Sequence, residues 1–447
     1  MEGFQEVVAQ AWERQAPNVD ACRLLDIKFR RTARALQSWS MTKVGSVRSQ
    51  LYMSREIIAQ LDKAQEGRTL TEEEIAWRRE LKGRCLGLAS LARTIARHRS
   101  RIRYLEEGDA NTKFFHLQAC HRKRKSYIPA FQLNGTWVSA EVEKEEIVFN
   151  YFKGILGTPF QRLHSLQFNE LLPTVNLSGI DACFSEEEIW AAVTDLPSDR
   201  APGPDGFSGI FYKMTWGTIK QDIINAFNAL WSLDGRSFHH LNGALMILLQ
   251  KKQQPTLVTD YRPISLIHSF SKLFTKCLAR RLAPKLDSIV SSNQTAFIKG
   301  RSIHDNFRAV QLACRWLYAK KVDAVLLKVD IAKAFDSVAW PFLLEALQHI
   351  GFPRRWIDWI SLLLSTSSTK VVLNGRPGNR ITHARGLRQG DPISPMLFVI
   401  VMESLNSLFK EADRRGRCSE KETIAKPKML IIKGKSTAGK LHAQPTG

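Results

Sequence analysis

The sequence contains no long hydrophobic run and little cysteine. Its apolar runs, such as residues 396–402, are far shorter than the roughly 20 residues that a bilayer span requires. The seven cysteines are scattered and never form a CxxC pair, so we expect reduced thiols and neither a disulfide scaffold nor a zinc site of that spacing. The N-terminus resembles neither a secretory signal nor a transit peptide. We therefore expect no membrane segment and a location in the cytoplasm or nucleus.

Acidic residues are scarce relative to basic ones. The 447 residues hold 65 Lys and Arg against 43 Asp and Glu, which gives a formal net charge of +22. A surplus of this size is typical of chains that neutralise a phosphate backbone, and it is unusual for enzymes of small metabolites. The length and the 44% hydrophobic content predict a folded chain of about two or three domains.

The first 127 residues are predicted to form a basic helical segment. Residues 51–105 have helical periodicity, with a capping box at Thr71–Glu74, and predict a long amphipathic helix. Residues 82–125 carry twelve Lys and Arg against three acids. This pattern fits either a solvated helix face or a surface that follows a nucleic-acid backbone. In the second case the contacting residues are Arg97, Arg99, Arg101, Arg103, Arg122, Lys123, Arg124 and Lys125.

The rest of the chain alternates between strand-like and helical stretches. Asn-Gly pairs at 134–135 and 374–375 predict two β-hairpins. Apolar runs at 244–249 and 325–329 predict strands. Helices are expected at about 142–152, 185–196, 269–283, 305–319, 341–350, 354–365 and 395–415. This succession predicts the α+β class.

Two aspartates follow the strand predicted at 325–329. Asp330 comes directly after it, so its carboxylate would emerge at a strand end beside a cleft. A lone Asp in that place is more often a helix N-cap. Asp336 lies six residues further on. By itself this spacing is a weak indication of a site.

Four stretches in order give these aspartates a context. They are DYRPISL at 260–266 after Lys251 and Lys252, NQTAFIKGR at 293–301, KVDIAKAFDS at 328–337 and GLRQGDPISPMLF at 386–398. Together they resemble the motifs of reverse transcriptases of non-LTR retrotransposons. Residues 108–116 and 201–207 resemble upstream segments of plant elements of this kind, so the resemblance covers about residues 95–412.

The resemblance implies RNA-templated DNA synthesis on an RNA template with a DNA primer, using two Mg²⁺ ions held by carboxylate oxygens. Asp330 matches the first metal ligand, and Ile331 would lend its backbone carbonyl. Gln389 and Gly390 match the catalytic turn under the nascent base pair. The resemblance places Lys251, Lys252, Arg262, Phe335 and Asp336 around the nucleotide, and Lys299 and Arg301 among the nucleic-acid contacts.

Each nucleotide contact has a chemical reason. Arg262 and a lysine at 251 or 252 would grip the triphosphate. Phe335 matches the bulky position that excludes a ribose 2′-hydroxyl, although a core aromatic is the simpler interpretation. We expect Asp330, Asp336 and the 386–392 turn to face one cleft, with the triphosphate-binding residues on its opposite wall.

The resemblance also implies a right-hand polymerase with fingers and a partial palm. The predicted divisions are a basic helical segment at 1–127, a connector with a hairpin at 128–184, fingers at 185–320, a partial palm at 321–413 within a core of about 245–413, and a basic tail at 414–447. The family's third motif, an Ala-Asp-Asp hairpin that supplies the second metal-binding carboxylate, does not occur, because no aspartate follows Asp413.

We therefore expect a truncated, incomplete and inactive reverse transcriptase. One alternative is a non-catalytic, sequence-nonspecific nucleic-acid-binding protein derived from such an element. Another is a subunit that takes the missing hairpin from a second chain. The sequence indicates neither the oligomeric state nor the identity of the template.

The charge surplus generates a prediction that does not depend on catalysis. The purified chain should bind RNA and DNA with little sequence preference, because the basic side chains act on phosphates. The logarithm of the association constant should fall linearly with the logarithm of salt concentration between about 50 and 200 mM, since bound cations are released. Fluorescence anisotropy with labelled oligonucleotides checks this, and an affinity that is indifferent to salt would contradict it.

Overall fold

The computed structural model describes residues 3–43, 45, 47–100, 112–160, 166–321, 324–328, 330–415, 424–426 and 429–433. The chain forms two compact units. The first comprises Met1–Ala16, Ile27–Ser139 and Leu249–Asp260, and the second comprises Pro17–Asp26, Ala140–Leu248 and Tyr261–Gly447. The predicted division into five segments stays a prediction.

The N-terminal helices pack through aromatic side chains. α1 (Phe4–Glu13) buries Trp12, whose ring meets that of Phe29 in α2 (Ala21–Lys43) edge to face, with 5.3 Å between centroids. Lys28 lies over the same Trp12 ring at 5.7 Å. This contact holds α1 against the part of α2 that belongs to the first unit.

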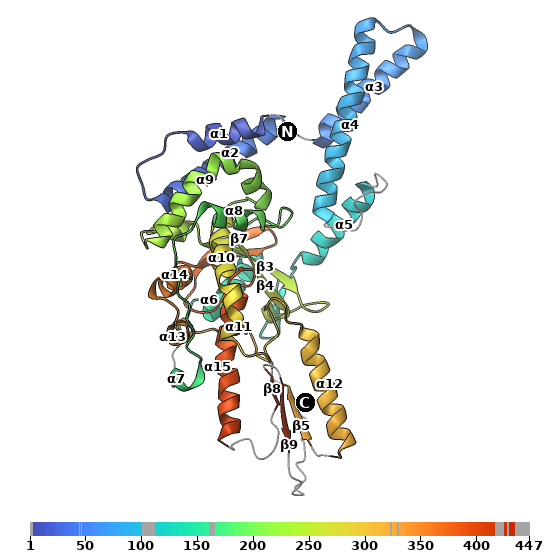
Figure 1. Ribbon diagram of the computed structural model, residues 1–447. Coiled ribbons are helices and arrows are strands. Elements are labelled where there is room, and N and C mark those ends of the chain that lie inside the picture. The colour runs from blue at the N-terminus through green and yellow to red at the C-terminus, as the bar shows by residue number, and fades with distance from the viewer. Residues whose placement is uncertain are drawn as a thin grey trace. The chain divides into compact units, whose positions relative to one another are not determined.

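A helical hairpin follows in the first unit. It consists of α3 (Val47–Gly67) and α4 (Glu72–Ser100), and α5 (Thr112–Ser126) packs against α4 (Figure 1). Phe115 and Ala96 are buried together at this last contact. The prediction of helical structure at 51–105 is therefore confirmed for the described residues, whereas the prediction of a single long helix is wrong.

The break between α3 and α4 has a local cause. Thr71 Oγ1 accepts a hydrogen bond from the Glu74 backbone N–H at 3.2 Å, and the Glu74 carboxylate accepts one from the Thr71 N–H at 2.9 Å. This confirms the predicted capping box, which starts a new helix. Arg68 pairs with Glu74 across the loop at 2.6 Å.

The first predicted β-hairpin is confirmed. β1 (Phe131–Leu133) and β2 (Thr136–Val138) pair antiparallel. Asn134 and Gly135 both have positive φ, at 49° and 85°, as the tight turn of such a hairpin requires.

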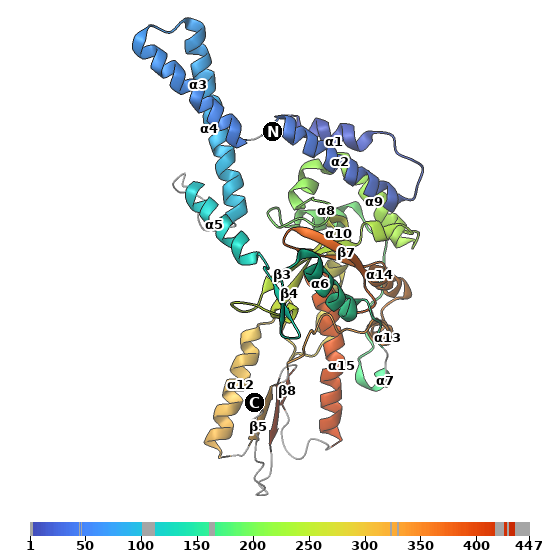
Figure 2. The same ribbon diagram turned by 180° about the vertical axis from the view of Figure 1, so that it is seen from behind.

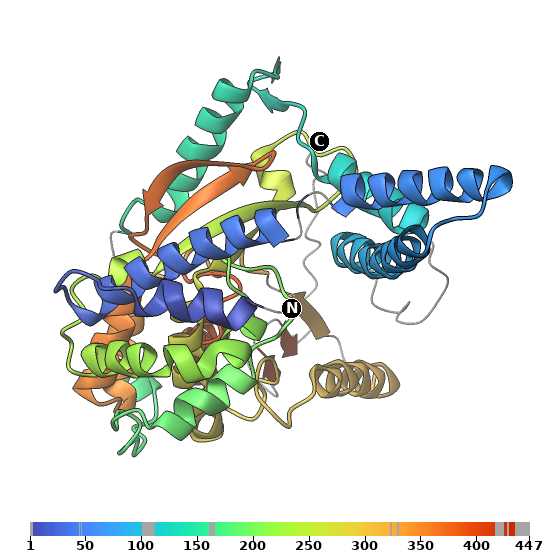
Figure 3. The ribbon, with the colours of Figure 1, turned by 90° about the horizontal axis from the view of Figure 1, so that it is seen from above.

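The second unit contains a four-stranded sheet in the order β4-β3-β6-β7. Its strands are β3 (Gly243–Gln250), β4 (Tyr261–Ile267), β6 (Ser368–Leu373) and β7 (Arg376–Thr382). β3 runs parallel to β6, and β6 pairs antiparallel with β7 through the predicted Asn374-Gly375 turn. α6 (Glu141–Leu156) lies along the β6–β7 hairpin (Figures 2 and 3).

Helices make up most of the second unit. In addition to α6 they are α7 (Phe168–Leu171), α8 (Glu186–Thr194), α9 (Gly209–Trp231), α10 (Ser269–Leu282), α11 (Leu286–Ile289), α12 (Ile303–Ala319), α13 (Trp340–Ile350), α14 (Arg354–Ser365) and α15 (Ser394–Arg414). Short 3₁₀ turns occur at Phe238–His240 and Ala283–Lys285, and the first unit has one at Val258–Asp260. Together with the sheets they confirm the α+β class.

The core of the second unit is an aromatic cluster. Phe184, Phe227, Phe274 and Trp359 are buried and stand 5.2 to 6.4 Å apart between ring centroids. The Trp359 indole N–H donates to the Leu230 carbonyl at 3.0 Å. These contacts join α9, α10 and α14 around one core.

A second sheet ends beside Asp330. β5 (Ala324–Lys328) pairs antiparallel with β9 (Met429–Lys433), which pairs with β8 (Ile424–Lys426). The strand predicted before Asp330 is thus present, while the partner strands come from the tail, where no structure was predicted. No helix in the described part of the chain is both long and apolar enough to span a bilayer.

Candidate active site

The turn at 386–392 places two predicted motifs side by side. The Gly386 N–H donates to the Val338 carbonyl and the Leu387 N–H to the Phe335 carbonyl, both at 2.8 Å. Gly386 has a φ of +83°, and a Cβ there would stand 2.9 Å from the Asp336 carbonyl oxygen. Only glycine allows this approach without strain. The stretch that holds Asp336 is therefore fixed against the turn.

The same turn touches strand β4. The Ser265 N–H donates to the Gln389 carbonyl at 3.1 Å. Gly390 has a φ of +105°, and a Cβ there would lie 2.9 Å from the Ser265 carbonyl oxygen. Arg262 is three residues earlier on β4 and exposed. The structure thus brings Gln389 and Gly390 to the strand that carries Arg262.

The segment after β5 presents its first residues to solvent. Asp330 and Ile331 are exposed, whereas Phe335 and Asp336 are partly buried. Phe335 stacks on Phe398 of α15, with 4.7 Å between centroids and 19° between planes. Stacking fixes the ring of Phe335, and Asp330 remains accessible.

The turn contains a buried guanidinium, that of Arg388, which is hydrogen-bonded to neighbouring elements. Arg388 donates to the backbone and side-chain oxygens of Asn242, at 3.0 and 2.6 Å, and pairs with Asp391 at 3.4 Å. Asn242 Oδ1 also accepts from the Ser271 hydroxyl at 2.8 Å. The Asn242 amide nitrogen in turn donates to the Leu363 carbonyl at 2.8 Å. We call Arg388, Asn242, Asp391 and Ser271 the Arg388 cluster.

Burial of this cluster has electrostatic consequences. Arg388 and Asp391 are 5% and 6% exposed, and burial lowers the pKa of the guanidinium while Asp391 opposes the change. The nearby His383 is buried too. Its burial, and secondarily the positive charge of Arg388, lower the pKa of the imidazole to about 3. His383 is therefore neutral at physiological pH, bonded to the Thr369 hydroxyl at 2.8 Å.

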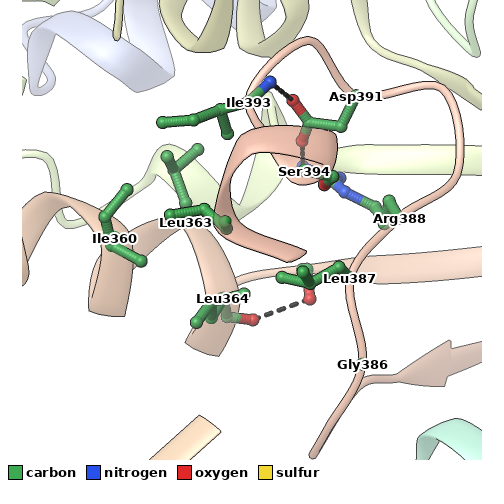
Figure 4. A pocket seen from close by; sticks show the side chains of 11 residues that line it. Ile360, Leu363, Leu364, Gly386, Leu387, Arg388, Asp391, Ile393 and Ser394 are labelled. Atoms are coloured by element: carbon green, nitrogen blue, oxygen red, sulfur yellow. Dashed lines mark hydrogen bonds and ion pairs between the residues drawn. The ribbon is translucent and has the colours of Figure 1, made fainter. Parts of the chain in front are cut away.

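A small cavity adjoins the turn (Figure 4). It measures about 20 Å³, close to what one ordered water needs, and Leu363 and Leu364 of α14 line it opposite Arg388. It is too small for a nucleotide.

The predicted triphosphate-binding lysines lie in the first unit. Lys251 Nζ donates to the Thr259 carbonyl at 2.9 Å, and Lys252 pairs with Asp260 at 3.0 Å. Asp260 also accepts from the Leu257 and Thr256 N–H groups, both at 3.0 Å. The hydrogen bond from Leu257 contributes most to the lowered pKa of Asp260. Their role in binding nucleotide stays a prediction.

The other predicted nucleic-acid contacts differ in accessibility. Lys299 is exposed, whereas Arg301 pairs with Asp287 at 2.7 Å and donates to the Ser291 and Gln294 carbonyls. Arg301 therefore holds its own loop together. Arg97 is half-buried, and Arg122, Lys123, Arg124 and Lys125 are exposed at the end of α5. The Arg99 side chain, Arg101 and Arg103 lie outside the described residues.

The described residues do not fit a two-metal site. They contain no group of three or more His, Cys, Asp or Glu side chains that could hold a metal ion. β9 and β8, which extend the sheet of β5, have the sequences MLIIK and IAK without a carboxylate. Glu403 is buried and accepts from the Ser291 hydroxyl and from Asn406 at 3.0 Å. Among the described residues, Asp330 is therefore in no cluster of three or more such side chains.

The sequence predicts the turn but not the residues of other elements that bind Arg388. Arg388 and Asp391 lie in the recognised motif, yet Asn242 and Ser271 belong to no pattern and lie 146 and 117 residues away from Arg388. The one indication of these partners in the sequence was an arginine within an apolar, glycine-containing turn. Such a residue needs buried acceptors, whose positions the sequence does not indicate.

Part of the chain is similar to known proteins. Residues 249–422, which include the turn and Asp330, match the family described as reverse transcriptase (RNA-dependent DNA polymerase). The chain is 23% identical over 318 residues to the transposon TX1 uncharacterized 149 kDa protein of Xenopus laevis, covering 70% of this chain and 24% of that protein. It is 27% identical over 280 residues to the Pol polyprotein of type-2 retrotransposable element R2DM of Drosophila melanogaster, covering 61% and 25%.

A further relative is the Pol polyprotein of retrotransposable element R2 of Nasonia vitripennis, 27% identical over 205 residues, covering 46% of this chain and 19% of that protein. The chain spans about a quarter or less of the length of these curated relatives. It contains a reverse transcriptase domain similar to that of non-LTR retrotransposon Pol proteins.

The Arg388 cluster predicts a stability effect. Asn242→Ala removes an acceptor from a buried guanidinium and should lower the free energy of unfolding by about 2 kcal/mol. Urea denaturation measures the change, and Asn379→Ala, at an exposed position of β7, is the matched control. Equal stability of the two variants would mean that the cluster does not hold the turn.

The lowered pKa of His383 predicts a pH dependence. The unfolded chain binds a proton at His383 near pH 6.5 and the folded chain only near 3, so stability is present above 6.5 and falls as pH drops towards 3. The loss at pH 5 should be about 2 kcal/mol. Urea denaturation at pH 7, 6 and 5 should show a shallower dependence for His383→Gln, and identical slopes would contradict the assignment.

Proposed function

We propose that the chain contains the fingers, at about residues 185–320, and part of the palm, at about 321–413, of the RNA-directed DNA polymerase of a non-LTR retrotransposon. We further propose that this polypeptide by itself does not sustain DNA synthesis. The observation that carries the first part is the pair of 2.8 Å hydrogen bonds between the Asp336 segment and the 386–392 turn. A polymerase needs these two motifs together to place a nucleotide beside a primer end.

The substrates follow from the side chains around the turn. An RNA template and a DNA primer would pass over Gln389 and Gly390, where the absence of a side chain at Gly390 allows close approach. Arg262 on β4 would bind the triphosphate with its planar fork of donors.

The proposed discrimination between deoxynucleotides and ribonucleotides depends on the ring of Phe335. Phe335 is held by its stack on Phe398 and would exclude a ribose 2′-hydroxyl, so deoxynucleotides are the expected substrates. Asp336, fixed beside Gly386, would line the same nucleotide site.

Inactivity is proposed from the carboxylates. Mg²⁺ requires near-octahedral oxygen coordination and gives up its water reluctantly, so Asp330 and the Ile331 carbonyl would hold it weakly. Loss of about 4 kcal/mol of transition-state stabilisation corresponds to roughly a thousandfold in rate. β8 and β9 add no acid beside β5.

The origin and setting are part of the proposal. The segments at 108–116 and 201–207 favour a plant-like element, and the scattered cysteines favour a reducing cytoplasmic or nuclear compartment. The similarity to Pol proteins favours a polymerase domain over the alternative, a non-catalytic, sequence-nonspecific nucleic-acid-binding protein derived from such an element.

Primer extension tests the proposal. With an RNA template, a DNA primer, deoxynucleotides and Mg²⁺ or Mn²⁺, the purified chain should bind the primer-template and extend it no faster than background. Asp330→Asn should change neither result. A retroviral reverse transcriptase serves as the positive control of the assay.

Two outcomes would contradict different parts. Extension that Asp330→Asn abolishes would mean that another residue or a second chain supplies the missing ligand, for example Glu420, which lies outside the described residues. Failure to bind the primer-template at low salt would contradict the polymerase assignment itself.

A further inference from the structure

Two segments of the first unit run side by side beyond the end of α5. The Gln250 side-chain amide donates to the Lys125 carbonyl at 2.6 Å, and the Gln132 N–H donates to the Thr256 carbonyl at 2.8 Å. These two hydrogen bonds tie both ends of the loop 251–255 to the stretch 126–131. The loop and the end of α5 therefore belong to one surface.

This surface is strongly positive. Residues 112–139 contain no Asp or Glu, and residues 249–260 contain one acid, Asp260. Asp260 is already paired with Lys252 and bonded to two backbone N–H groups. Six exposed cations come together here, namely Arg122, Lys123, Arg124, Lys125, Lys251 and Lys252.

Two large aromatic side chains are exposed beside these cations. Tyr127 directly follows α5 and is 50% exposed, and Trp137 on β2 is 60% exposed. Trp137 pairs with Gln132 across the hairpin, and the neighbouring Phe131, on the opposite face, is fully buried. Burial of Phe131 anchors the hairpin, so Trp137 is held on its accessible face.

We propose that this surface, which we call the basic aromatic surface, binds single-stranded RNA outside the polymerase turn. Its members are the six cations with Tyr127 and Trp137. The cations neutralise successive phosphates, and the two rings stack on unpaired bases. The inference rests on the proposed function only for its choice of RNA as the strand.

The aromatic residues make the surface selective for single strands. In a duplex the bases are stacked on each other, so side chains at the surface reach only phosphates and groove edges. A purely ionic surface would bind duplex and single strand alike. Stacking adds binding free energy only where bases are unpaired, and it tolerates any base because each has a π face.

The binding experiment uses the full chain and two labelled probes, a 15-nucleotide oligouridine and an RNA duplex of equal length. Trp137→Ala and Tyr127→Ala should each weaken oligouridine binding about tenfold, the effect of one stacked base. Duplex binding should change less than about twofold, and Trp137→Phe should restore most of the affinity for the single strand.

Exposed aromatic residues elsewhere in the same unit serve as controls. Trp77 on α4 and Tyr52 on α3 are 49% and 68% exposed, and their alanine variants should bind oligouridine like the unchanged chain. Circular dichroism of each variant checks that β1–β2 and α5 remain folded. Unchanged oligouridine affinity in Trp137→Ala, or equal weakening for the duplex, would overturn the proposal.

The charge component has its own measurement. Changing Arg122, Lys123, Arg124 and Lys125 to Gln should reduce the slope of log affinity against log salt by up to about 3, at roughly 0.7 for each phosphate on a single strand. Changing Lys251 and Lys252 to Gln should reduce it by about 1.4. Slopes equal to that of the control pair Arg78→Gln and Arg79→Gln would overturn the inclusion of these cations.

The two proposals fail in different ways. If the chain binds no nucleic acid, the polymerase proposal fails and the present one fails with it. If the chain binds primer-template normally but Trp137 and Tyr127 have no effect on oligouridine, only the basic aromatic surface is wrong.

Discussion

The second unit depends on the buried charge of Arg388. A guanidinium that is removed from water needs acceptors for its donors, and here Asn242 and Asp391 provide them. Because Asn242 also binds Ser271 and Leu363, the start of β3, helix α10, helix α14 and the turn before α15 are held to one geometry. Hydrophobic contacts have no preferred direction. Hydrogen bonds to a planar guanidinium restrict both the direction and the distance at which these elements pack.

The turn above this charge owes its shape to two glycines. Gly386 lies against the Asp336 backbone and Gly390 against that of Ser265, both with positive φ. The fixed turn connects the end of one sheet, where Asp330 is exposed, with β4 of the other. An exposed carboxylate, a rigid turn and an exposed arginine thus share one region of the second unit. The described strands beside β5 contribute apolar and basic residues and no carboxylate.

Charged side chains are distributed differently in the two units. The first unit gathers cations around residues 112–139, which contain no acid, and 249–260, which contain one, Asp260, and it adds two exposed rings. The second unit buries the pair of Arg388 and Asp391, whereas Arg301 is partly buried beside an exposed Asp287. Exposed charges act on a phosphate backbone through a screened field, whereas buried pairs determine local geometry. Binding and positioning can therefore be disturbed independently by mutation.

The sequence by itself determined the local elements and the order of the motifs. The two Asn-Gly turns, the capping box at Thr71 and the strand before Asp330 were predictable because each depends on neighbouring residues. The strands β8 and β9 and the placement of Lys251 beside α5 were not. Neither was Asn242, which meets Arg388 across 146 residues. Those features depend on contacts between segments that are distant in the sequence. Only the tertiary structure decided them, because buried polar groups must find hydrogen-bond partners and the sequence does not indicate where these partners lie.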